Sequence, residues 1–360
     1  MSDLAGNIVT ASATRNVPAQ NHYGFIDNAK AIGIALIVLG HSRGLPDYLS
    51  HLIFSFHVPL FFFISGFLIK PTKLEATIVS NSKKSLQNIG IPYVLFFLVA
   101  FIYWLVTRNV GIKALLYAGN TWYGPVVGFF SGLESDLYVD PPLWFFPCFL
   151  LTVIAYHASR KLLTTMTSTC LFVVLAFAIS MLWKFVPYRF PLGLDSMWIG
   201  LAFYAIGQCV RDKDYFTHIK RVYFIFTFIA AFGLLAFVVS KTGSVDLANM
   251  HFGVWPSLYF PIALLGIIAT FSVSRLLPSS IVSKWLSENT LTIFPLHFIF
   301  FSFIRGMAIS LHLIPKNYNY GIGWSVVSSA LAILLCIPAV YILRRLPLPT
   351  DSFGRSRVGK

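Results

Sequence analysis

The feature that most limits what this chain can fold into is the length of its apolar blocks, which run for about 18 to 25 residues between short polar stretches. A helix needs roughly 20 apolar residues to cross the hydrocarbon core of a bilayer. Only 11% of the 360 residues are charged, whereas about a quarter of the residues of a soluble domain are charged. The pattern predicts an all-α, polytopic bundle of transmembrane helices and excludes an ordinary soluble enzyme.

The blocks predict about ten transmembrane helices in one integral domain, residues 23–345. Residues 1–22 are polar and lack a cleavage pattern, so we expect a disordered cytoplasmic tail. Residues 346–360 are expected to form a basic cytoplasmic tail. The expected crossings are residues 25–45, 51–69, 89–107, 142–158, 164–183, 193–210, 222–240, 255–273, 290–312 and 321–343.

The net charge of +14 does not indicate a nucleic-acid partner, because the basic residues lie between apolar blocks and not on one amphipathic face. With the N-terminus in the cytoplasm, eighteen of the 27 lysines and arginines fall on the cytoplasmic side and eight on the opposite side. Since basic loops favour the cytoplasm, this distribution predicts that both termini are cytoplasmic. The four cysteines lack the close spacing of metal or redox motifs and are expected to be small buried hydrophobic side chains: Cys148, Cys170, Cys209 and Cys336.

The longest connection, residues 108–141, lies on the predicted outer side and includes Trp122, Glu134 and Asp136. A connection of this length is often functional, here as a lid or an acceptor-binding loop. A disordered or lipid-contacting linker explains it equally well at this stage.

The first block, "DNAKAIGIALIVLGHSRG" at residues 27–44, is apolar in its middle and ionisable at both ends. Lys30 and His41 are eleven residues apart, which places them within about 20° of one helical face and roughly 16 Å apart along the axis. Asp27 and Lys30 are spaced to form a pair on one turn. Ionisable groups are expensive in a membrane, so these residues and Arg43 are candidates for a functional site.

The second block, "HLIFSFHVPLFFFISGFLIK", returns through the membrane and brings His57 to about the depth of His41. Pro59 is expected to kink this helix, and Ser65 with Gly66 to admit another backbone closely. An imidazole can take a proton from a hydroxyl and return it. Each histidine alone is more often structural, but two at one depth in register with a lysine favour a site.

Two later stretches supply secondary candidates. Trp144 in "DPPLWFFPCF" stands at a helix entrance, where an interfacial position is favoured. The stretch "SENTLTIFPLHFIFFSFIR" carries His297 near the middle of a crossing and Arg305 near its end. The sequence contains no HExxH zinc motif, P-loop, GxSxG elbow or dinucleotide-binding glycines, so no metal site is predicted.

Four stretches resemble the acyltransferase family 3 membrane proteins, in the branch of fucose 4-O-acetyltransferase-like enzymes of bacterial exopolysaccharides. The first two together are specific: "FIDNAKAIGIALIVLGH" followed by "FHVPLFFFISGFLIK". "PPLWFFPCFL" and "ENTLTIFPLH" are similar to later family blocks in the same order. The resemblance covers about residues 25–345, and Lys30 and His41 fit the family's spacing of a basic residue, ten positions and a histidine.

The resemblance implies a bacterial inner-membrane O-acyltransferase. The enzyme would move an acetyl group from cytoplasmic acetyl-CoA, a substrate and not a bound cofactor, to a sugar hydroxyl of an exported or lipid-linked glycan, with exopolysaccharide preferred. Other membrane proteins of polysaccharide assembly are implied as partners. His41 would be the general base or the acetyl acceptor, His57 would orient it or stabilise the oxyanion, and Lys30 with Asp27 would hold the donor or position the helix.

The chief alternative is a transporter or flippase of a glycan or lipid intermediate, in which buried charges line a substrate path. Such proteins often consist of two halves with matching helix interruptions, and residues 25–183 and 193–343 show no such symmetry. A purely structural membrane subunit is the third possibility, and it leaves the two histidines unexplained.

Overall fold

A computed structural model describes residues 24–69, 77–111, 113–114, 117–212, 219–315, 317–349 and 352–353. Within these residues the regular structure is helical, apart from one isolated antiparallel bridge between Asp246 and His251. The predicted N-terminal tail lies outside the described residues, as does most of the predicted C-terminal tail. The all-α fold class predicted from the apolar blocks is confirmed.

Helices lie at all ten predicted crossings. Seven stretches of the described chain are long and apolar enough to cross a membrane: Asp47–Phe67, Ile78–Thr107, Pro141–Leu162, Arg221–Thr242, Pro256–Leu276, Thr290–Ser310 and Ile322–Arg345. The remaining three are shorter helices of 16 or 17 residues: Gly24–Gly40, Met166–Leu182 and Met197–Asp212. The protein is therefore a multi-pass helical membrane protein.

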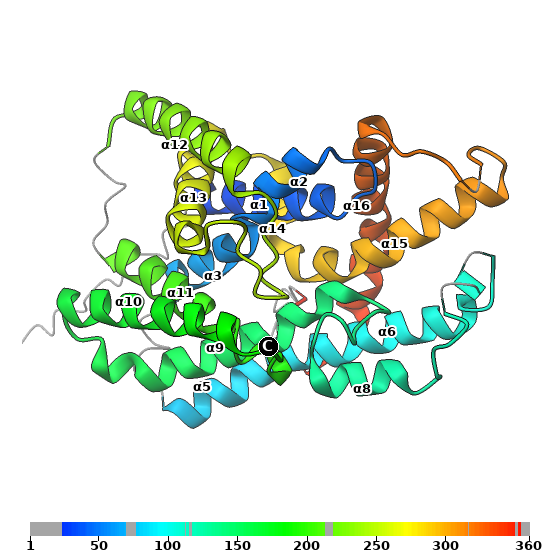
Figure 1. Cartoon of the computed structure of the whole chain (residues 1–360), viewed down its shortest axis with the longest axis horizontal. Coiled ribbons are helices and arrows are strands. Elements are labelled where there is room, and N and C mark those ends of the chain that lie inside the picture. The colour runs from blue at the N-terminus through cyan, green and yellow to red at the C-terminus, as the bar shows by residue number, and fades with distance from the viewer. Residues whose placement is uncertain are drawn as a thin grey trace, which may run out of the picture.

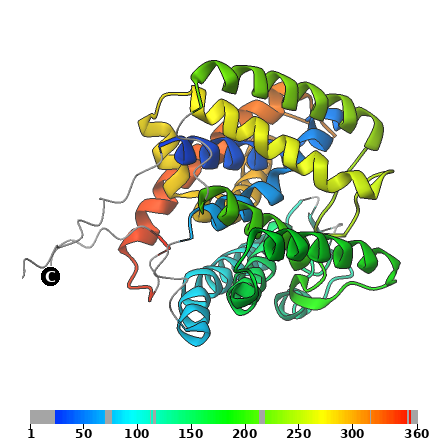
Figure 2. The ribbon, with the colours of Figure 1, turned by 90° about the vertical axis from the view of Figure 1, so that its left-hand side faces the viewer.

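The helices used below are α1 (Gly24–Gly40), α2 (Asp47–Phe54), α3 (His57–Phe67), α5 (Ile78–Ser85), α6 (Ile91–Thr107), α8 (Gly124–Ser131), α9 (Phe145–Ser159), α10 (Met166–Leu182), α11 (Met197–Asp212), α12 (Arg221–Thr242), α13 (Tyr259–Leu276), α14 (Ile281–Glu288), α15 (Thr290–Ser310) and α16 (Ile322–Arg345). In two perpendicular views α12 and α13 form the upper part of the bundle and α5 and α9 the lower part (Figures 1 and 2).

The second crossing is interrupted where the sequence predicted a kink. Helix α2 ends at Phe54, and α3 begins at His57 after Phe56, whose backbone is not helical. Pro59 thereby falls in the first turn of α3, where a missing N–H removes no hydrogen bond from the helix. The break turns His57 into the first residue of a new helix.

Helices α3 and α11 pack backbone to backbone. A Cβ atom added to Gly66 of α3 would lie 2.0 Å from the carbonyl oxygen of Tyr204, and one added to Gly207 of α11 would lie 2.0 Å from that of Phe63. Small residues permit such contacts between helices in a membrane. The close approach predicted at Gly66 is confirmed, and it fixes the helix that carries His57.

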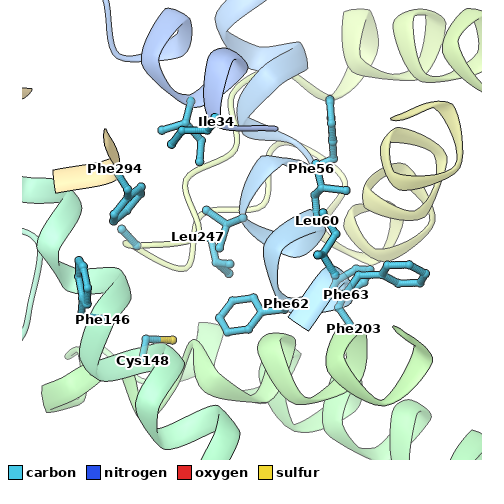
Figure 3. Packing of buried hydrophobic residues seen from close by; sticks show 14 of the residues in the cluster. Ile34, Phe56, Leu60, Phe62, Phe63, Phe146, Cys148, Phe203, Leu247 and Phe294 are labelled. Carbon is cyan, nitrogen blue, oxygen red and sulfur yellow. The ribbon is translucent and has the colours of Figure 1, made fainter. Parts of the chain in front are cut away.

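A loop after α12 enters the bundle instead of remaining at its surface. We call residues 243–255 the inserted loop. Leu247 lies among side chains of several helices, with Ile34 and Phe294 on one side and Leu60 on the other (Figure 3). The loop's buried apolar side chains belong to the same core as the helices: Val245, Leu247, Ala248, Met250 and Phe252.

Residues 117–141 do not form the disordered linker that was one alternative for the long connection. Helix α8 packs against α6 through the stacked rings of Phe129 and Tyr93, with centroids 4.9 Å apart. Leu137 and Asp140 are fully buried. This part of the connection is a folded element of the bundle.

The expectation that all four cysteines are buried is wrong for Cys170, which is exposed, while Cys209 is half-buried and Cys148 and Cys336 are buried. Cys170 lies on α10, where only Ala176 and Ser180 are buried. An apolar block does not by itself reveal which of its faces meets neighbouring helices, because lipid and protein interior are both apolar.

Candidate active site

Three histidines from three helices meet in the bundle. His41 follows the last residue of α1, His57 opens α3, and His297 lies in α15. The ring centroid of His41 is 6.2 Å from that of His57 and 5.1 Å from that of His297. The sequence predicts His41 and His57 at one depth. The structure adds His297, a secondary candidate from the sequence, to the same cluster.

All three rings are held in the same way. In each, Nδ1 lies within hydrogen-bonding distance of the main-chain carbonyl oxygen four residues earlier. Because a carbonyl oxygen only accepts, Nδ1 carries the hydrogen, and Nε2 of a neutral ring is left as the acceptor. The pairs are His41 with Ile37 at 2.9 Å, His57 with Ile53 at 3.0 Å and His297 with Ile293 at 3.3 Å.

A cavity of about 30 Å³ lies beside these rings, lined by His41, His57, Trp144 and Asp246 among apolar side chains. Trp144 is 9% exposed and faces this cavity, so the interfacial position favoured for it is wrong. The polypeptide places it there because the four residues Pro141–Trp144 form a 3-10 turn that leads inward to α9. Ligand pockets usually measure about 300 to 1,000 Å³, so the site is closed around the imidazoles in this structure.

Asp246, from the inserted loop, is the acidic residue of the cavity. It interacts electrostatically with His41 and lies close enough to act on its charge. Its own carboxylate accepts hydrogen bonds from the backbone and side-chain N–H groups of Asn249. No motif around Asp246 identifies it in the sequence, because its position depends on the folding of the loop into the bundle.

The inserted loop is anchored next to the start of α11. The guanidinium of Arg189 donates two hydrogen bonds to the carboxylate of Asp195, at 2.5 and 2.8 Å, and a third to the carbonyl oxygen of Ala248. Ser196 donates to the carbonyl oxygen of Leu247 at 3.1 Å. Burial raises the pKa of Asp195, but Arg189 outweighs it and holds that pKa below its usual range. Arg189 and Ser196 thus hold the main chain of the two loop residues that follow Asp246.

Lys30 and Asp27 lie away from the histidine cavity. Asp27 accepts a hydrogen bond of 2.6 Å from Ser287 at the end of α14. Lys30 interacts electrostatically with Asp27 and with Glu288. Since Lys30 precedes His41 by eleven residues, the two are separated by roughly 16 Å along α1. The structure therefore forms a second polar cluster at the opposite end of α1.

The other sequence candidates lie outside the cavity as well. The hydroxyl of Ser65 donates to the carbonyl oxygen of Phe61 in its own helix at 2.7 Å. Arg43 and Arg305 meet near Tyr320, beyond the end of α1. Over the described part of the chain, no group of three or more histidine, cysteine or acidic side chains is placed to hold a metal ion.

A larger cavity, of about 640 Å³, lies between α6 and α9. It is lined by apolar side chains except for Tyr93, whose hydroxyl donates to the carbonyl oxygen of Phe129. It contains no group that can act as an acid, a base or a nucleophile, so the small histidine cavity is the candidate for chemistry.

Comparison with known families identifies the family of the chain. A family model described as an acyltransferase domain, that of the acyltransferase 3 family, matches residues 23–342. The chain belongs to the acyltransferase 3 family. No curated protein and no solved structure gave a match. As an acyltransferase 3 protein, the chain is a membrane acyltransferase, which takes an acyl group from a donor and passes it to an acceptor.

Proposed function

We propose that this acyltransferase 3 protein is an O-acetyltransferase that uses acetyl-CoA as donor and a sugar hydroxyl of an exported or lipid-linked glycan as acceptor. The observation that carries the proposal is the cluster of three imidazoles, each with Nδ1 committed to the main chain and Nε2 left to accept a proton. Such an arrangement suits general-base chemistry on a hydroxyl.

His41 is the proposed base, because it lines the cavity together with the carboxylate of Asp246. Its Nε2 removes the proton of the acceptor hydroxyl while the hydroxyl oxygen bonds to the carbonyl carbon of the thioester. The C–S bond then breaks, and the thiolate of CoA takes the proton from the same Nε2. During the reaction His41 is transiently positive, and the negative charge of Asp246 stabilises it.

His57 is proposed to hold His41 in place, since a neutral ring with the hydrogen on Nδ1 offers no donor at Nε2 for an oxyanion. Trp144 lines the same cavity and carries an indole N–H, a group that donates and never accepts. We assign the stabilisation of the developing oxyanion to Trp144.

The donor is proposed to enter from the end of α1 that carries Asp27 and Lys30, which the distribution of basic loops predicts to be cytoplasmic. Lys30 supplies a positive charge there, next to two acidic residues, Asp27 and Glu288. The separation from His41 of roughly 16 Å along α1 leaves Lys30 out of the chemical step. Its role is to hold the donor or to position α1.

The test uses membranes that contain the protein, radiolabelled acetyl-CoA and a lipid-linked saccharide extract. We expect His41→Ala to lower acetyl transfer by about 10² to 10⁴, the usual contribution of a general base. His51→Ala is the matched control, because His51 lies in α2 and does not line the cavity. Transfer that survives in the His41→Ala protein contradicts the proposed base.

A further inference from the structure

Arg43, in the turn after α1, and Arg305, in α15, contact one aromatic ring near the histidine cluster. The Cζ atom of Arg43 lies 5.9 Å from the ring centroid of Tyr320, and that of Arg305 lies 5.7 Å from the same centroid. Nε of Arg305 also donates to the hydroxyl of Tyr320 at 2.7 Å. The two guanidinium groups carry charges of the same sign and repel each other.

The backbone holds this arrangement in place. Gly44 has a φ of +88°, and a Cβ added to it would lie 2.6 Å from the carbonyl carbon of Tyr320. Only a glycine combines that conformation with that approach. Ser325 of α16 donates to the carbonyl oxygen of Arg43 at 2.8 Å. The main chain of the loop that carries Arg43 therefore packs directly against the main chain of the loop that carries Tyr320.

Neither arginine forms an ion pair with a carboxylate among the described residues. Arg43 is exposed and Arg305 is half-buried, so both guanidinium groups can be reached by a ligand, and their contacts with Tyr320 leave their positive charges without a counterion from the described part of the chain. A guanidinium presents five N–H donors in a fork that matches the oxygens of a phosphate or a carboxylate. An anion from a bound ligand would match the donors and the charge of these two arginines.

The position of the pair relates it to the reaction. The turn that follows α1 carries His41 and, two residues on, Arg43, while helix α15 carries His297 and, eight residues on, Arg305. Eight helical residues span about 12 Å. The pair thus lies beyond two of the three imidazoles, at the end of α1 opposite Lys30. The donor proposed above enters from the Lys30 end, which leaves this end to the acceptor.

We propose that Arg43 and Arg305 form a binding site for an anionic group of the acceptor, so that the acceptor is a glycan bearing phosphate or carboxylate oxygens. The inference rests on the proposed function, and it names the class of acceptor. Because the arginines lie beyond the imidazoles, the anionic group and the acetylated hydroxyl must be different groups of one acceptor molecule. An anion seated there aligns the acceptor with the base.

The test measures anion binding directly, on the full-length protein in nanodiscs of phosphatidylcholine, with inorganic pyrophosphate and glucuronate as the two probes. We expect wild-type protein to bind at least one probe, and Arg43→Gln and Arg305→Gln each to weaken that binding by about tenfold or more, since a charged hydrogen-bond partner is lost. Tyr320→Phe removes one hydroxyl alone and is expected to weaken binding less, and it remains informative if an arginine variant fails to fold.

Arg108→Gln is the matched control. Arg108 also stacks on an aromatic ring, that of Trp104 at 4.4 Å, and it lies on the same predicted side of the membrane, but it belongs to another loop. We expect its loss to leave probe binding unchanged. Equal weakening by Arg108→Gln means that overall charge attracts the anion, and it overturns the proposal.

The two probes separate the two sources of anionic oxygens. Loss of pyrophosphate binding in the arginine variants assigns the site to a phosphate-linked acceptor, and loss of glucuronate binding assigns it to an acidic sugar. Wild-type protein that binds neither probe overturns the proposal while leaving acetyl transfer by His41 intact. Conversely, His41→Ala protein that still transfers acetyl groups defeats the proposed function without changing the anion binding.

Discussion

Replacing Gly66 with alanine tests the contact that positions α3 and hence His57. The new Cβ would lie 2.0 Å from the carbonyl oxygen of Tyr204, whereas ordinary contacts of a Cβ lie at 3.4 to 4 Å. The helices α3 and α11 must therefore separate by about 1.4 Å at this point, because a backbone oxygen cannot rotate away as a side chain can. Overpacking of this kind costs about 1 to 3 kcal/mol, and we expect the upper part of that range.

The matched control is Gly233→Ala in α12, since a Cβ at Gly233 meets nothing within 4 Å. Both positions are inside helices. Alanine stabilises a helix relative to glycine by roughly 0.5 to 1 kcal/mol, so both variants gain this amount of folding free energy. The difference between them is therefore packing alone. Thermal unfolding of the detergent-solubilised proteins should give a lower midpoint for Gly66→Ala than for wild type, and an equal or higher one for Gly233→Ala. Equal midpoints for the two variants would refute the close packing of α3 on α11.

Two further predictions concern the inserted loop. Asp246→Asn keeps the size of the side chain but removes the charge near His41, so we expect slower acetyl transfer, measured in the assay proposed for His41. Thermal stability should fall by only about 1 kcal/mol, because one of the two hydrogen bonds from Asn249 is lost; unchanged transfer would exclude a role in the reaction. Asp195→Asn breaks a buried pair with Arg189 and should cost about 3 kcal/mol at neutral pH, the low end of the range for such pairs because Arg189 is 24% exposed. Since the pKa of Asp195 is depressed in the folded protein, its stabilisation is present above the unfolded pKa of about 3.9 and is lost as the pH falls through the folded value. Wild-type and variant melting midpoints should therefore converge in acid, and a constant gap between them would contradict the ion pair.

The sequence predicted most of the architecture because the bilayer imposes it. A crossing needs about 20 apolar residues in a helix that satisfies its own backbone hydrogen bonds, so apolar blocks reveal helices even without an alignment. The break at Pro59 and the close approach at Gly66 were also predictable, because both follow from the chemistry of a single residue. The pairing of His41 with His57 followed from the short connection between two consecutive helices.

What the sequence did not reveal depends on contacts between distant segments. Asp246 comes from a loop with no helical periodicity, and only the folding of that loop into the bundle brings it to the cavity of His41. Trp144 was assigned to the interface because a tryptophan at a helix entrance usually lies there, but the turn at Pro141–Trp144 directs it inward. The common contact of Arg43 and Arg305 with Tyr320 depends on the connection from α15 to α16, which brings Tyr320 close to both.

The shared bonding of the three imidazoles limits how protons travel. In each ring Nδ1 is bonded to the main-chain carbonyl oxygen four residues earlier, so a proton that arrives at Nε2 cannot leave from the other side of the ring. Among the described residues, the three imidazoles therefore do not form a relay in which each ring passes a proton through itself. In the proposed reaction, the proton taken from the sugar hydroxyl leaves on the thiol of CoA. The enzyme therefore completes each turnover without any net exchange of protons with the solution.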